Sequence, residues 1–85
     1  MDNAIILTRI ENTDFYIFKS LSLGYGYFEY SGCDSAFFNG VEIEGALDVV
    51  GEGAIRIVGE REKITVIVQA FGISTFENLK QGIVL

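Results

Sequence analysis

Ten glycines and no proline divide the 85-residue chain into short runs rich in β-branched and aromatic residues. Runs of this kind, bounded by turn-forming residues, are typical of strands joined by tight connections. Apolar residues make up 49% of the chain, which is enough for one core but too little for two. We therefore predict a single domain over residues 1–85 that is mainly β (α+β at most). Its fold would be an antiparallel meander or small barrel of about six or seven short strands with one short C-terminal helix.

The first expected strands follow one another with short connections. Ala4–Ile10 and Phe15–Leu21 form a predicted hairpin around the turn residues Glu11–Asp14, and Tyr25–Ser31 is the third strand. Further apolar runs predict strands at 46–50, 54–58 and 64–71. Residues 64–71 are apolar on both faces, which is typical of a central strand covered on both sides.

The pair Asn39-Gly40 readily adopts the positive φ angles of a hairpin turn. It predicts pairing of Ser35–Phe38 with Val41–Glu44. The alternative is one helical turn that is capped by Asp34 and ends at Gly40.

The only helix signal lies near the C-terminus. Ser74 and Glu77 have the spacing of a capping box, and Gly82 occupies the place of a C-terminal cap. The pattern predicts a helix of about two turns. The apolar residues Ile83–Leu85 would then add a final strand, because an apolar terminus usually pairs with another segment.

Charge is distributed unevenly along the chain. No Lys or Arg lies between Lys19 and Arg56, so this segment alone carries the whole net charge of −6. An acidic segment of this kind suits a basic partner, whereas binding to a phosphate backbone requires clustered Lys and Arg. The alternatives are that the charge only confers solubility or binds Ca²⁺ weakly. The carboxylates of the segment are Glu29, Asp34, Glu42, Glu44, Asp48 and Glu52.

The aromatic residues are also concentrated, because nine of the eleven lie between Phe15 and Phe38. Many of them must fill the core. Tyr25 and Tyr27 share one face of their expected strand, beside Glu29, and two alternatives remain open for them. They are exposed and contribute to a protein interface, where tyrosine is favoured, or they lie under a loop or helix with their hydroxyls at the rim.

Residue types that carry common catalytic chemistry are scarce. The chain has no histidine, and Asp34 next to the single cysteine, Cys33, disfavours a reactive thiolate. Glu42 and Glu44 would lie about 7 Å apart on a strand, but any acidic strand face looks the same. We therefore expect no enzymatic activity, cofactor or metal. The lone cysteine, and the lack of a signal peptide or apolar span, favour the cytoplasm, or a host cytoplasm.

These features predict a small acidic binding protein or inhibitor that presents an acidic, tyrosine-containing face to a basic protein, such as one that handles nucleic acid. In size, charge and lack of catalytic residues it is similar to phage-encoded anti-defence and anti-CRISPR proteins and to toxin-immunity proteins. No membrane or direct nucleic-acid contact is expected. The alternative is a structural subunit, for instance a homodimer, assembled through strand edges and the apolar C-terminus. The expected contact residues are Tyr25, Tyr27, Glu29, Asp34, Glu42, Glu44, Asp48 and Glu52.

Overall fold

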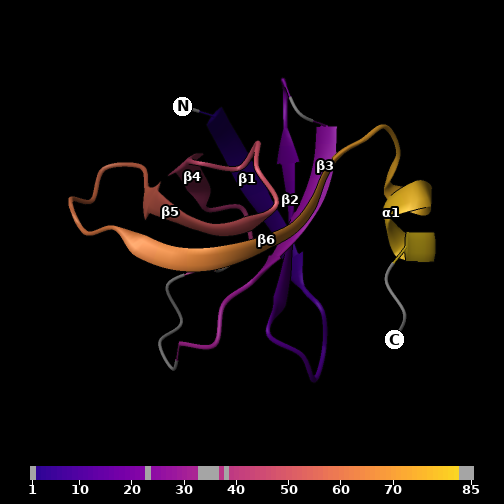
Figure 1. Ribbon diagram of the computed structural model, residues 1–85, viewed down its shortest axis with the longest axis horizontal. Helices are drawn as coiled ribbons and strands as arrows, with labels where there is room; N and C mark the ends of the chain where they lie inside the picture. The colour runs from indigo at the N-terminus through magenta and orange to yellow at the C-terminus, as the bar shows by residue number, and fades with distance from the viewer. Residues whose placement is uncertain (1, 23, 33–36, 38, 83–85) are drawn as a thin grey trace.

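The computed structural model describes residues 2–22, 24–32, 37 and 39–82. Within these residues, six strands form a closed antiparallel barrel in the order β1–β2–β3–β6–β5–β4, and one short helix follows the last strand (Figure 1). The prediction of a mainly β fold with a C-terminal helix is confirmed. The elements are β1 (Asp2–Arg9), β2 (Phe15–Ser20), β3 (Gly24–Glu29), β4 (Glu42–Gly45), β5 (Gly51–Ile57), β6 (Ile64–Ile73) and α1 (Phe76–Gly82).

The sheet closes because its last strands return to its first. β1, β2 and β3 form a meander, β6 then pairs with β3, and β4 pairs with both β1 and β5. Each of these six strands therefore has a hydrogen-bonded neighbour on both sides along part of its length. Closure of this kind removes the free edges to which another strand could add.

The turn at Asn39 and Gly40 is present, and Gly40 has the expected positive φ of 90°. The hairpin partner predicted for the following strand is wrong, because both sides of β4 are occupied by β1 and β5. The turn is instead fixed to β1. The Gly40 amide donates to the carbonyl oxygen of Ile6 (2.7 Å), and the Ile6 amide donates to that of Val41 (2.9 Å). Asp34, Ser35, Ala36 and Phe38 lie outside the described residues.

The strand predicted at 46–50 is also wrong, because these residues form an irregular loop between β4 and β5. Leu47 is completely buried in the core and anchors the loop. Its apolar neighbours Val49 and Val50 are each 62% exposed. The apolar run 46–50 therefore combines one buried side chain, Leu47, with two exposed valines. Composition alone does not distinguish such a run from a strand.

Aromatic side chains form one part of the barrel core. Phe18 of β2 and Phe28 of β3 are completely buried and stacked, with ring centroids 6.1 Å apart. Phe37 packs edge-on against Phe28 at 5.4 Å, and Tyr16 packs edge-on against Phe37 at the same distance. Contacts of this type contribute about 0.5–1.5 kcal/mol each beyond the area they bury. Within the described residues, four of the twelve buried residues of the barrel core are therefore aromatic and belong to this segment, and the other eight are aliphatic.

Gly26 of β3 allows the barrel wall to bend around these rings. It lies opposite Phe18 in register, and the Phe18 ring covers the space that a side chain would occupy. The pairing of β3 with β6 shifts register on both sides of Tyr27. Bulges and ring-covered glycines are common where a sheet curves to close on itself.

Helix α1 begins one residue later than the sequence pattern predicts. The Thr75 hydroxyl accepts a hydrogen bond from the amide of Asn78 (3.1 Å), and the Thr75 carbonyl accepts one from the amide of Leu79 (3.2 Å). Thr75 is therefore the N-cap residue. The predicted capping box of Ser74 and Glu77 is wrong by one position.

The helix packs against the outside of the barrel mainly through Leu79, and the ring of its first residue, Phe76, lies beside that of Tyr25. Leu79 is completely buried against Ile17 of β2, in a second apolar cluster separate from the barrel core. Ile83–Leu85, for which a final strand is predicted, lie outside the described residues. In the part of the chain that is described, no helix has the length and apolar character needed to cross a membrane.

Candidate functional site

The register of the barrel arranges outward-facing side chains in rows across neighbouring strands. Glu29 of β3 pairs with Ile67 of β6, and Ile67 pairs in turn with Glu52 of β5. Directly paired residues project from the same face of a sheet, so this row, which we call the acidic row, places a carboxylate on each side of Ile67. Two strand spacings separate the two glutamates by about 10 Å.

Ile67 is the apolar centre of the acidic row and is 43% exposed. The prediction that residues 64–71 are covered on both faces is therefore wrong. Val66 and Val68 point into the core, whereas Ile67 faces outward. The sequence contained a signal for this difference, because Thr65 and Gln69, which share the period-two face of Ile67, are polar.

The two carboxylates of β4 have different surroundings. Glu44 pairs in register with Arg56 of β5, whose Nε donates to Glu44 Oε1 (2.9 Å), and Nη2 of the same guanidinium contacts the same oxygen. This pair is the only ion pair within the described residues. Glu42 is exposed and forms no ion pair with any described cation. Of the predicted acidic contact residues that the structure describes, Glu44 is therefore the one whose charge is balanced by a cation of the chain, Arg56.

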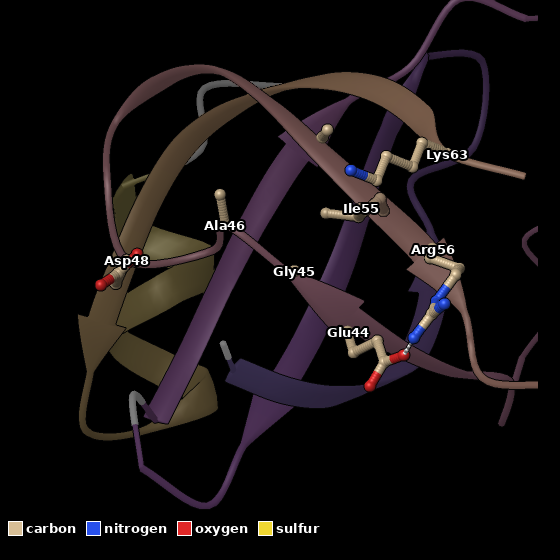
Figure 2. Close-up of a pocket in the computed structure, with 8 residues that line it drawn as sticks. Glu44, Gly45, Ala46, Asp48, Ile55, Arg56 and Lys63 are labelled. Carbon is tan, nitrogen blue, oxygen red and sulfur yellow. Dashed lines mark hydrogen bonds and ion pairs between the residues drawn. The ribbon is translucent and has the colours of Figure 1, made fainter. Parts of the chain in front are cut away.

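A hollow of about 420 Å³ lies beside this ion pair (Figure 2). Small residues and Ile55 form its apolar floor, and Asp48 and Lys63 lie at opposite ends of it in Figure 2. The hollow therefore carries both signs of charge and adds no negative potential. Its lining residues are Glu44, Gly45, Ala46, Asp48, Ala54, Ile55, Arg56 and Lys63.

Tyr25 and Tyr27 are half-buried and belong to the apolar cluster beneath α1. The ring of Tyr25 lies 5.9 Å from that of Phe76, and the Nζ atom of Lys19 lies 5.5 Å from the centroid of the Tyr25 ring. Tyr27 packs edge-on against Phe15 at 5.5 Å. The second alternative, in which a helix covers the two tyrosines, therefore describes their packing better than a free aromatic face.

The structure distributes the predicted contact residues among four places. Glu29 and Glu52 lie in the acidic row, Glu44 and Asp48 line the hollow, and Glu42 lines a separate hollow beside β1 and β2. The two tyrosines lie under α1, and Asp34 is outside the described residues. Ile67 was not among the predicted contact residues, although the polar residues Thr65 and Gln69 on the same strand face indicate that this face is exposed.

The described residues contain no group of three or more His, Cys, Asp or Glu side chains that could hold a metal ion. The calcium alternative for Glu42, Glu44 and Asp48 therefore has no support in the geometry. Glu44 is held by Arg56, so it is also not a free partner for Glu42 in a pair of catalytic carboxylates. What the outer face offers chemically is charge and exposed apolar area.

Comparison of the chain with protein-family models finds no match. No curated protein and no solved structure matches it either.

Proposed function

We propose that this chain is a non-enzymatic binding protein whose acidic row docks onto a basic protein partner. The observation that carries the proposal is the arrangement of Glu29 and Glu52 on either side of the exposed Ile67. An apolar anchor between two carboxylates matches a partner surface with an apolar pocket or side chain between two Arg or Lys residues. No described cation forms an ion pair with either glutamate.

A second copy of the chain does not suit this row. Two acidic rows brought together would place carboxylates against carboxylates, which repel when they are desolvated. A net charge of −6 adds long-range attraction for any cationic partner and speeds the encounter at low salt. The preferred partner is therefore a different protein that carries a basic surface.

The mechanism that follows is competition. The carboxylates would pair with Arg and Lys side chains that otherwise bind the phosphates of a nucleic acid. They would thereby block a protein that handles nucleic acid, without any contact between this chain and the nucleic acid. Inhibition of this type fits the size and charge by which the chain is similar to anti-defence and immunity proteins. The alternative of an assembly subunit joined by strand edges has less support, since the six described strands close into a barrel.

The test uses a defined probe, a fluorescein-labelled peptide with one leucine between two arginine pairs. Its binding to the whole protein is measured by fluorescence anisotropy at low and at raised salt. The double variant Glu29→Gln/Glu52→Gln should weaken binding by about 1–2 kcal/mol, or roughly fivefold to thirtyfold, since exposed charge pairs contribute up to about 1 kcal/mol each. Raised salt should weaken binding to the unmodified protein.

The matched control is Glu60→Gln/Glu62→Gln, which removes the same charge from the exposed β5–β6 connection. It should lower the affinity by less than twofold. Equal losses in both double variants would show that only net charge matters and would overturn the acidic row as the site. Binding that is insensitive to salt would overturn the electrostatic mechanism.

A further inference from the structure

A second row of outward-facing residues crosses the barrel on β2, β1 and β4. Ile5 of β1 pairs with Lys19 of β2 on one side and with Glu42 of β4 on the other. We call these three residues the mixed row. Ile5 is 45% exposed, so the row has an apolar centre with a cation at one end and an anion at the other. β1 and β6 are three places apart in the ring of six strands, so the mixed and acidic rows lie on opposite sides of the barrel.

The mixed row forms part of a hollow of about 360 Å³. Leu21, just beyond the end of β2, also lines this hollow, and its side chain is fully exposed. Leu21 and Ile5 therefore form an apolar patch beside this hollow that is exposed to solvent in the isolated chain. The lining residues are Asn3, Ala4, Ile5, Lys19, Leu21 and Glu42.

Neither charged side chain of the mixed row forms an ion pair within the described residues. Two strand spacings separate the backbones at Lys19 and Glu42 by about 10 Å, and no ion pair joins their side chains across Ile5. Within the described residues, the single ion pair is that of Glu44 and Arg56. The ammonium group of Lys19 lies over the ring of Tyr25 and keeps its remaining hydrogen-bonding capacity.

From this geometry we propose that the mixed row binds a second copy of the chain in a twofold-symmetric dimer. A twofold axis that lies in the interface over Ile5, parallel to β1, places the two Ile5 side chains against each other and sets Lys19 of each copy opposite Glu42 of the other. A row with one cation, one apolar centre and one anion is complementary to itself in this way, as an isologous interface requires. The acidic row has the same sign at both ends and lacks this property.

The dimer is expected to be weak. Stable dimers bury about 800 Å² on each partner, and six lining residues around a shallow hollow supply less than that. Long-range repulsion between two copies of charge −6 opposes association, but it is largely screened at physiological salt, whereas short contacts persist. The dimer leaves the opposite face of the barrel open, so this inference does not depend on the proposed function.

Sedimentation velocity on the intact chain tests the proposal, with protein at about 10 µM to about 1 mM, a range that covers weak dissociation constants. The unmodified protein should pass from monomer to dimer across this range. Lys19→Glu and Glu42→Lys should each be monomeric throughout, because each makes both cross-dimer charge contacts repulsive. An equimolar mixture of the two variants should restore dimers, because every contact in the heterodimer is again between opposite charges.

The charge-matched controls are Lys80→Glu on α1 and Glu60→Lys in the β5–β6 connection, and both should dimerise like the unmodified protein. Leu21→Ser, at a fully exposed position that folding does not require, should weaken the dimer roughly threefold or more by removing apolar contact. A chain that stays monomeric at the highest concentration would overturn the proposal. So would dimers that persist in both single charge variants, or a mixture of those variants that remains monomeric.

Discussion

Gly26 offers the sharpest test of how this barrel closes. A Cβ atom at this position would lie 2.5 Å from Cζ of the Phe18 ring and would overlap the carbonyl oxygen of Ala70 on the neighbouring β6. The ring can rotate or shift, but the carbonyl belongs to the backbone of the barrel wall. Gly26→Ala therefore forces β3 and β6 apart at a point where their pairing is already shifted by bulges.

The magnitude follows from the two overlaps. In an open strand the same substitution would stabilise the fold by about 0.5–1 kcal/mol, because alanine loses less backbone entropy than glycine. Overpacking a dense core costs about 1–3 kcal/mol, and a backbone obstacle places this site at the upper end. For a domain of this size, a loss of about 3 kcal/mol lowers Tm by roughly 12–24 °C.

Thermal and urea unfolding followed by circular dichroism measure this loss. Gly82→Ala is the control, since nothing lies within 4 Å of its added Cβ, and it should leave Tm unchanged or slightly raised. In a Phe18→Leu background, Gly26→Ala should cost about 1 kcal/mol less, because one of its two obstacles is shortened. A Gly26→Ala variant that unfolds at or above the Tm of the unmodified protein would refute the reasoning.

Three smaller predictions concern α1 and the surface. Leu79→Ala should cost about 2 kcal/mol, at the low end for a buried leucine because the helix can detach, and the helical signal near 222 nm should fall while the barrel stays folded. Thr75→Ala should lower the free energy of unfolding by about 1 kcal/mol through loss of the cap, with Ser74→Ala as a neutral control. Arg56→Met should cost less than about 1 kcal/mol, and high salt should remove the difference. A helical signal that survives Leu79→Ala would contradict the role of Leu79 as the main anchor of α1.

The local pattern predicted the strands best where turn residues separated runs rich in β-branched and aromatic residues. The hairpin of β1 and β2 follows from two such runs on either side of Glu11–Asp14. The pattern failed at 46–50, where one buried leucine anchors a loop that otherwise faces solvent. It also misplaced the helix cap by one residue, since both Ser74 and Thr75 are good N-cap residues and only the fold selects between them.

The candidate site was less predictable than the fold. The sequence identified acidic residues but could not show which of them meet across strands that are distant along the chain. Glu29 and Glu52 become neighbours of Ile67 only through two separate strand pairings with β6. Glu44 forms an ion pair with Arg56, so its charge is not available to a partner. The distribution of charge along the chain does not reveal this pairing.

The sequence by itself determined the class of fold, because alternation, glycine spacing and aromatic content act over a few residues at a time. It also determined the net charge and the scarcity of catalytic residue types, since these need no geometry. Only the tertiary structure decided the ring order of the strands, and with it that two carboxylates flank Ile67 on one side while Lys19 and Glu42 flank Ile5 on the other. The physical reason is that register and closure depend on pairing between distant segments, and one residue of slip would turn every one of these side chains to the opposite face.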